Sequence, residues 1–463
     1  MAYQETTTTS YGQRVSSSCG GIITGIVLFF AGTALLWWNE GRAVKTDKML
    51  NEAQGVTVEM PDVNKVNPEF EGKLVHATAL ATTEDSLSDG SFGIGAKAIS
   101  IERKVEYYQY VEHSESKSRD KIGGGQETVT TYTYKMEWTS KPVNSQEFHD
   151  PAYQNKNFVV CQHEDARQYA QNVSFGAYKL TEGQIHSISG IQPFVPTFTD
   201  EQMKRWNTVT AQKIRTMGAN TAITTSSLAD TAPATANDST ATASVSRDYD
   251  YVHLRDNVLY YGANPSSPQL GDVRVTFTKV MPAQVTIIAT VTGNTFKPFK
   301  AENGKTFSTL VMGQKSVDEI YQGEHDTNNM MLWLLRIVGI AIVIGGLKTT
   351  FSIFETLMKI LPFLANIVGF GVGLVCTIVG TVWSLLVIAI AWIAYRPVLG
   401  ITILVVAGGI LGFFVYRGRQ KKLQQPQPAQ QPGQAPNYQG LYDQYKKNNQ
   451  NLNGQNPGQP GQR

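Results

Sequence analysis

The sequence predicts an integral membrane protein with four transmembrane α-helices and a large, β-rich α+β domain outside the membrane. Long apolar segments near both ends of the chain predict the helices. Several stretches between them alternate apolar and polar residues, which is typical of β-strands. The net charge of +2 over 463 residues provides no strongly basic face, so we expect no nucleic-acid partner.

The first apolar segment follows a short polar N-terminus, residues 1–18, which we assign to the cytosol. We assign residues 19–38 to the first span, because residues 22–38 form an almost unbroken apolar run that ends in Trp37 and Trp38, and tryptophan favours the membrane interface. The alternative is a cleaved signal peptide, since residues 31–34 are small. Because the apolar run continues past them, we favour an uncleaved transmembrane helix.

Further apolar segments lie in the C-terminal part of the chain. Residues 360–416 are too long for one helix and contain a single charge, at Arg396. We divide this segment at Arg396 and Pro397, since proline ends a helix and a charge prefers the membrane surface. The predicted spans are residues 330–347, 366–395 and 397–416, with an amphipathic linker over 348–365 that lies flat in the cytosolic interface.

The orientation follows from the basic residues beside the spans. A cluster at 417–422 directly follows the last apolar segment, and such clusters favour the cytosol. Four spans then place both termini in the cytosol and residues 39–329 in the lumen. Arg42 and Lys45, after the first span, count against this orientation. The tail, residues 417–463, is basic and then rich in glutamine and proline, so we expect it to be disordered.

The predicted lumenal domain carries clear strand patterns. Residues 99–107 and 132–138 alternate in hydrophobicity, and Gly123–Gly125 fall in the loop between them, which predicts a long hairpin. Residues 273–277 alternate in the same way, and the strand 284–292 precedes a Gly-Asn turn.

One helix and one disordered insert complete the domain. Thr199 and Asp200 can cap a helix that runs through Met203, Trp206 and Ile214. Residues 219–246 contain mostly threonine, serine, alanine and asparagine, which cannot bury enough apolar surface to offset their ordering entropy.

The domain shows little evidence of chemistry. Cys161, His163, Glu164 and Asp165 are the nearest approach to a metal-binding cluster, but no second cluster has matching spacing, so we favour a polar loop. His76 lies in a strand-like stretch and is expected to be structural. We expect no catalytic residue, cofactor or metal.

Glycine pairs at four-residue spacing recur in the predicted spans and indicate close helix packing and association with a second copy of the chain. The alternative is that glycine is simply common in membrane helices. The pairs are Gly21 and Gly25, Gly369 and Gly373, and Gly408 and Gly412, with Ala341 and Gly345 in the second span. Asn172 and Asn237 stand in glycosylation sequons, which matter if the domain is lumenal.

Several segments occur in the order expected of one known family. They are Asn39-Glu40-Gly41-Arg42 and the residues to Thr46, residues 72–76, 106–112, 132–138 and 271–277, Trp333 to Arg336, and Tyr395-Arg396-Pro397. Together they cover most of residues 11–416, and the chain resembles the LUMA family, also called transmembrane protein 43.

The resemblance implies a four-span protein of the endoplasmic reticulum and inner nuclear membrane whose large loop is lumenal. It also implies self-association, binding to emerin-like and lamin-like proteins, and a role in organising the nuclear envelope. No catalytic residues come with the family. The Ser/Thr-rich insert and the Gln/Pro-rich tail differ from it, and in a bacterial host the protein would lie in the cell membrane.

The sequence leaves two functional classes open. The leading interpretation is a non-enzymatic, self-associating scaffold in the lipid bilayer. The rival is a membrane enzyme or transporter that uses a buried arginine and polar residues of the lumenal domain. Arg336 lies inside the second predicted span. Its guanidinium either extends to the lipid headgroups or faces the helix bundle and pairs with Glu40.

Overall fold

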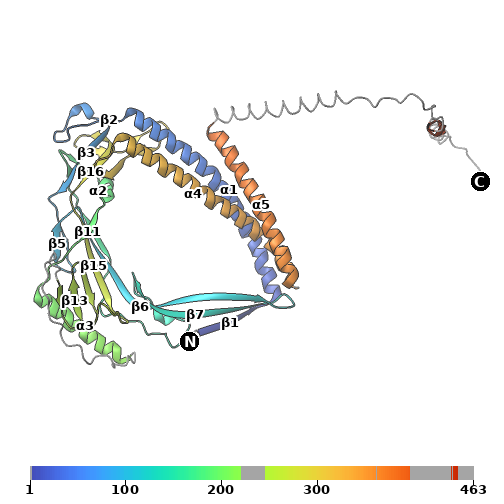
Figure 1. The fold of residues 1–463 in the computed structure, drawn as a ribbon, viewed down its shortest axis with the longest axis horizontal. Helices are drawn as coiled ribbons and strands as arrows, with labels where there is room; N and C mark the ends of the chain where they lie inside the picture. Colours follow the sequence, from blue (N-terminus) through green and yellow to red (C-terminus); the bar gives the residue numbers. More distant parts are fainter. Residues whose placement is uncertain (1–2, 221–245, 361, 397–439, 441, 447–463) are drawn as a thin grey trace, which may run out of the picture. The chain divides into compact units, whose positions relative to one another are not determined.

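The computed structural model describes residues 3–220, 246–360, 362–396, 440 and 442–446 (Figure 1). The chain divides into two units, Met1–Arg396 and Pro397–Arg463, and every element discussed below belongs to the first unit. The predicted span 397–416, the predicted disordered insert 219–246 and the predicted tail 417–463 lie wholly or mostly outside the described residues.

The described part of the first unit contains five α-helices and twenty β-strands. The helices are α1 (Tyr11–Val56), α2 (Glu182–Ser187), α3 (Asp200–Asn220), α4 (Val317–Met358) and α5 (Pro362–Tyr395). The strands are β1 (Tyr3–Thr9), β2 (Val58–Glu59), β3 (Leu74–Thr83), β4 (Ser86–Asp89), β5 (Ile94–Lys97), β6 (Ser100–Asp120), β7 (Gln126–Thr139), β8 (Ala166–Tyr169), β9 (Val173–Phe175), β10 (Tyr178–Lys179), β11 (Ile191–Pro193), β12 (Ser246–Asp248), β13 (Val252–Arg255), β14 (Val258–Tyr261), β15 (Val273–Val280), β16 (Ala283–Thr292), β17 (Thr295–Lys297), β18 (Phe299–Lys300), β19 (Thr306–Phe307) and β20 (Thr309–Met312).

Three helices in the described part of the chain, α1, α4 and α5, are long and apolar enough to cross a membrane. They lie side by side (Figure 1). Helices α1 and α4 are antiparallel, because Tyr11 Oη donates to the Leu357 carbonyl at one end and Gln54 Nε2 donates to Asp318 at the other. The chain is therefore a membrane protein with a β-rich domain, and its described residues contain three of the four expected spans.

Helix α1 is much longer than the predicted span 19–38. It begins early because Ser10 and Gln13 form a capping box that satisfies the first backbone amides. It continues to Val56 because no proline interrupts it and its last turns are buried against the β-domain, at Met49 and Leu50. The predicted span is the apolar middle of one continuous helix.

The prediction of a separate flat helix over 348–365 is wrong, because α4 continues without a break to Met358. The hydroxyls of Thr349 and Thr350 donate to the carbonyls of Gly345 and Gly346, each at 2.8 Å. These polar side chains are therefore satisfied within the helix, and α4 needs no bend to expose them.

A nine-stranded sheet contains the predicted long hairpin. Its main path is β1-β7-β6-β15-β14-β13-β12, with β8 beside β6 and β11 beside β15. Strands β6 and β7 pair continuously from Tyr107 and Thr139 to Asp120 and Gln126, which confirms the predicted hairpin. Helix α3 confirms the predicted helix, and its Met203 lies in the core beneath this sheet.

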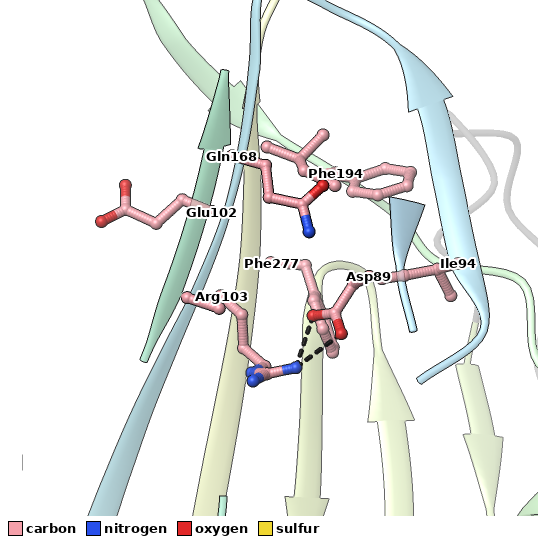
Figure 2. Close-up of a pocket in the computed structure, with 9 residues that line it drawn as sticks. Asp89, Ile94, Glu102, Arg103, Gln168, Phe194 and Phe277 are labelled. Carbon is pink, nitrogen blue, oxygen red and sulfur yellow. Dashed lines mark hydrogen bonds and ion pairs between the residues drawn. The ribbon is translucent and has the colours of Figure 1, made fainter. Parts of the chain in front are cut away.

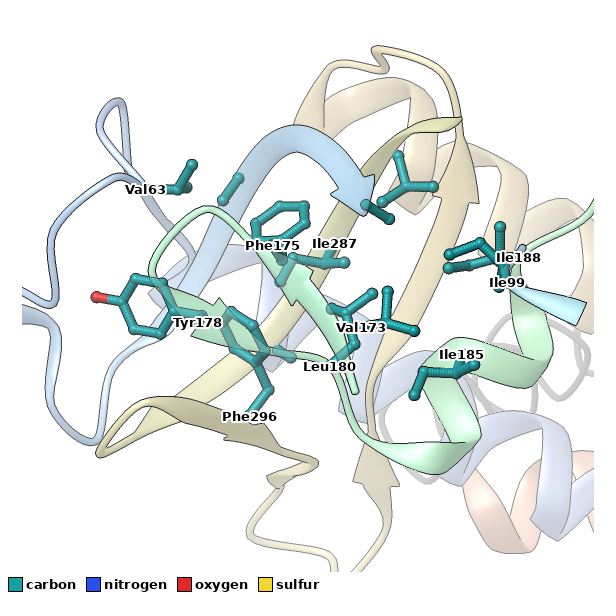
Figure 3. Packing of buried hydrophobic residues seen from close by; sticks show 14 of the residues in the cluster. Val63, Ile99, Val173, Phe175, Tyr178, Leu180, Ile185, Ile188, Ile287 and Phe296 are labelled. Carbon is teal, nitrogen blue, oxygen red and sulfur yellow. The ribbon is translucent and has the colours of Figure 1, made fainter. Parts of the chain in front are cut away.

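A seven-stranded sheet, with β3 and β16 paired at its centre, forms the second half of the domain. Its core gathers the aromatic rings of Phe175, Tyr178 and Phe296 around Ile287, with Ile185 of α2 at one side (Figure 3). The predicted strand 284–292 and its turn are present as β16 and β17.

A third apolar cluster joins the membrane helices to this sheet. Leu50 of α1 and Tyr321 of α4 pack with Ile288 of β16 and Phe307 of β19. Each of these side chains is at most 6% exposed. Burial on this scale fixes the domain to the ends of both helices.

The N-terminal strand creates a conflict with the predicted topology. Strand β1 pairs with β7, from Tyr3 opposite Tyr132 to Thr9 opposite Gln126, so residues 3–9 belong to the sheet of the β-domain. The sequence analysis places residues 1–18 and 39–329 on opposite sides of the membrane. A polar strand pair cannot be shared across a bilayer, so the pairing and a fully crossing α1 exclude each other.

Candidate functional site

The family segment Asn39 to Arg42 lies on the face of α1 that packs against α4. It follows Trp37 and Trp38, which are both exposed and mark the end of the apolar section. The side chains of Asn39 and Glu40 are nevertheless almost completely buried, at 0% and 1% exposed as residues. Polar groups this deep between two helices require partners.

Glu40 forms an ion pair with Arg336 of α4. Arg336 Nε lies 2.6 Å from Glu40 Oε1, and Nη2 lies 2.9 Å from Oε2. Trp333, one turn earlier, places its ring 4.8 Å from the Arg336 guanidinium carbon. Of the two interpretations open to the sequence analysis, the structure contains the inward-facing pair.

Asn39 and Arg42 extend these contacts along the same helix faces. Asn39 Nδ2 donates to the Leu332 carbonyl at 3.0 Å, and Arg42 Nη1 donates to Asn328 Oδ1 at 3.1 Å. Asn328 Nδ2 in turn donates to the Ala43 carbonyl at 3.0 Å. We name Asn39, Glu40, Arg42, Asn328 and Arg336 the polar clamp, because every one of them bonds across from one helix to the other.

Gly41 brings α5 to the same level. A Cβ atom at this position would lie 2.5 Å from Tyr395 Cζ, so only glycine leaves room for the Tyr395 ring. Tyr395 also packs against Trp37, with ring centroids 5.9 Å apart. Arg396 follows at the end of α5, its guanidinium 6.0 Å from the Trp392 ring, and Pro397 lies outside the described residues.

The charges continue into the domain beside the clamp. Lys305 Nζ donates to Thr46 Oγ1 at 2.7 Å. Burial, followed by the neighbouring charges of Arg42 and Lys45, lowers the pKa of Lys305. Basic groups are therefore concentrated where the helices enter the domain.

Glycine contacts hold α1 and α4 together below the clamp. A Cβ atom on Gly25 would lie 2.6 Å from the Gly346 carbonyl oxygen, and one on Gly32 would lie 3.1 Å from that of Gly339. Such closeness is possible only where both helices carry glycine. The sequence analysis named Gly25 but missed Gly32, Gly339 and Gly346, whose signal is a matching seven-residue spacing in both helices.

The other predicted packing glycines lie in different surroundings. A Cβ atom on Gly21 would meet Thr349 at 3.7 Å, and one on Gly369 would meet Glu355 at 3.0 Å, both on α4. A Cβ atom on Gly345 or Gly373 would have no neighbour within 4 Å among the described residues, apart from the backbone of its own helix. Gly408 and Gly412 lie outside the described residues.

Polar residues in the β-domain form structural contacts. His76 bridges Glu59 at 2.7 Å and the Lys315 carbonyl at 2.8 Å. Asn172 is exposed and donates to Asp85, and Asn237 lies outside the described residues. No group of three or more metal-ligating side chains occurs in the described part of the chain.

His163 of the predicted polar loop borders a buried ion pair that the sequence analysis missed, and Cys161 packs against the core of the nine-stranded sheet. Arg103 Nη1 lies 2.6 Å from both carboxylate oxygens of Asp89, beside a cavity of about 10 Å³ (Figure 2). Burial, followed by the charge of Arg103, lowers the pKa of His163, and burial raises the pKa of Cys161. A buried, protonated thiol is a poor nucleophile and a poor metal ligand.

Fold and site together define a membrane protein whose apolar helices are joined by a buried polar clamp and carry a large β-rich domain. The sequence profile of the family described as Transmembrane protein 43 matches residues 107–397. The chain belongs to this family, which confirms the resemblance to LUMA.

Three relatives show how far the similarity extends. Transmembrane protein 43 of Rattus norvegicus is 29% identical over 395 residues, covering 83% of this chain and 87% of the relative. The Homo sapiens protein is 28% identical over the same lengths. The Drosophila melanogaster homolog is 24% identical over 391 residues, covering 82% of this chain and 90% of the relative. No solved structure matches the chain.

Proposed function

We propose that the protein is a non-enzymatic membrane scaffold of the endoplasmic reticulum and inner nuclear membrane. It associates with copies of itself, recruits emerin-like and lamin-like proteins where the host has them, and holds its β-domain in the lumen. The location and these partners rest on family membership.

One observation carries the scaffold interpretation. The inner faces of α1 and α4 pack against each other through the polar clamp and the glycine contacts. Helix α5, in contrast, exposes large apolar side chains on its outer surface. These side chains include Ile367, Phe370, Leu374, Ile378 and Val382, each more than half exposed. A rigid helix unit with an apolar exterior suits lateral packing with other membrane helices.

The rival function, an enzyme or transporter, lacks support from its key residue. It required a buried arginine able to bind a substrate or ion. Arg336 is instead held by both carboxylate oxygens of Glu40.

Self-association can be tested at Gly373, which has open space where a side chain would project. We expect Gly373→Leu to reduce crosslinked oligomers in membranes at least several-fold, because leucine pushes a partner helix away. The thermal midpoint of the monomer should not change, since no described residue lies within 4 Å.

Gly371→Leu is the matched control, because Gly371 is equally open and points to a different side of α5. A wild type that stays monomeric in membranes at native abundance would refute self-association. An equal loss in both variants would show that the effect is not specific to the Gly373 face.

A further inference from the structure

A cavity of about 260 Å³ lies on the face of the nine-stranded sheet opposite the core. One cross-strand row forms its floor: His253 is paired with Tyr260, and Tyr260 with Arg274. Trp138 and Pro268 line its apolar side. The volume is just below the range of roughly 300–1,000 Å³ that is typical of drug-sized ligand pockets.

His253 supplies a buried polar atom without a partner. Its side chain is 9% exposed, and its Nδ1 lies 3.0 Å from Asp248 Oδ1. Its Nε2 is buried and has no hydrogen-bond partner in the described residues, although the residue lines the cavity. A buried ring nitrogen left without a partner costs free energy that a ligand can recover.

Two arginines, Arg255 and Arg274, line the cavity. Arg274 is neutralised by Glu106, with Nε 2.7 Å from Oε2. Arg255 and His253, by contrast, share the single carboxylate of Asp248, and Arg255 Nη2 is 3.7 Å away from it. An added anion would accept a hydrogen bond from the Arg255 guanidinium.

Trp138 provides part of the apolar wall for the rest of the ligand. The Arg274 guanidinium covers this ring at 4.3 Å, and Tyr260 meets it edge-on at 6.2 Å. Both contacts fix the orientation of the indole.

We propose that this cavity binds a small organic anion, with its carboxylate or phosphate group toward Arg255 and its ring against Trp138. The volume admits one ring with one acidic group. The site is independent of the polar clamp and of the proposed scaffold function.

Calorimetric titration of the full chain in nanodiscs with phenyl phosphate and, separately, benzoate tests the proposal. We expect at least one probe to bind, and the preferred probe identifies phosphate or carboxylate as the acidic group. Arg255→Gln should weaken binding at least tenfold with an unchanged thermal midpoint, because this side chain is 54% exposed.

Arg167→Gln is the control, since Arg167 is a half-exposed arginine in an ion pair on the same sheet and lies outside the cavity. It should bind the probe like the wild type. The proposal is wrong if neither probe binds at millimolar concentration, or if Arg255→Gln binds as tightly as the wild type.

Discussion

At the scale of single residues, the Glu40–Arg336 pair is the most consequential contact in the helix unit. The carboxylate is almost fully buried and the guanidinium is 14% exposed. Removing one partner of such a pair costs roughly 3–5 kcal/mol, because it strands a charge away from water. We predict that Arg336→Leu and Glu40→Gln each lower the thermal midpoint and the accumulation of folded protein, and that the double variant recovers part of the loss.

A double-mutant cycle on these variants measures the coupling directly. Arg396→Gln serves as the control, because Arg396 is near the same membrane level and its side chain makes, among the described residues, a distant contact with Trp392. Strictly additive losses would mean that the two residues do not interact.

Asp272 offers a second test at the residue scale, outside the membrane. Burial raises its pKa to about 6, although Tyr260 and the Gln269 amide donate to its carboxylate. The unfolded value is about 3.9. Because the folded pKa is the higher one, the native state binds the proton more tightly, so this group adds stability as the pH falls from 7 through 6 toward 4.

Asp272→Asn should remove this dependence. We predict that the thermal midpoint of the wild type, measured relative to Asp272→Asn in nanodiscs, rises between pH 7 and pH 5. Comparing the two proteins cancels the carboxylates with lowered pKa values, such as Glu106, whose effect has the opposite sign. A constant difference across this range would contradict the assigned pKa.

At the scale of elements, the seven-residue glycine spacing determines how closely α1 and α4 pack. We predict that Gly346→Ala lowers the free energy of unfolding by about 1–3 kcal/mol, because the added Cβ would lie 2.6 Å from the Phe29 amide nitrogen of α1. Gly345→Ala, one residue away, faces open space and should leave the thermal midpoint in nanodiscs unchanged or slightly raised. Equal effects of the two substitutions would exclude this packing.

The elements also show how far local sequence patterns can predict this fold. Alternation predicted β6, β7 and β15, and in β6 and β15 the buried residues fall largely at alternate positions, which is a local signal. Strand β16, which is buried on both faces, was predicted from the run that leads to its turn. The pairing of β3 with β16 could not be predicted, since it joins residues about two hundred positions apart. The ends of α1 and α4 were also missed, because tertiary packing on the β-domain extends both helices beyond their apolar sections.

The residues of the polar clamp could also be predicted only in part. Glu40 and Arg336 could be suggested as partners, because Glu40 lies just after the first predicted span and Arg336 is a charge inside the second. Asn328 could not, because an asparagine near a helix end has many uses and only the antiparallel packing of α4 brings it to Arg42.

At the scale of the whole molecule, the free energies decide between a paired β1 and a crossing α1. Strand β1 contributes seven residues of edge pairing. At about 0.5–1.5 kcal/mol for each hydrogen bond, offset by about 1–2 kcal/mol of ordering entropy for each residue, its net value is a few kcal/mol at most. Helix α1 exposes seven large apolar side chains between Ile23 and Trp38. At about 1.5–3 kcal/mol each, their transfer into hydrocarbon is worth roughly 10–20 kcal/mol.

The free energies therefore favour an α1 that spans the bilayer over a β1 that stays paired with β7. The polar strands β6 and β7 cannot enter the hydrocarbon region with α1. We predict that β1 separates from β7 when α1 spans the bilayer, so that residues 3–9 and the β-domain occupy opposite sides. In sealed microsomes, protease should remove an N-terminal tag while the β-domain stays protected until the membrane is permeabilised. Disulfide crosslinking offers a second measurement, because Thr7 of β1 lies opposite Thr128 of β7 when the two strands are paired. A disulfide between Thr7→Cys and Thr128→Cys in intact membranes, with the tag and the domain protected together, would instead establish that both ends of α1 lie on one side.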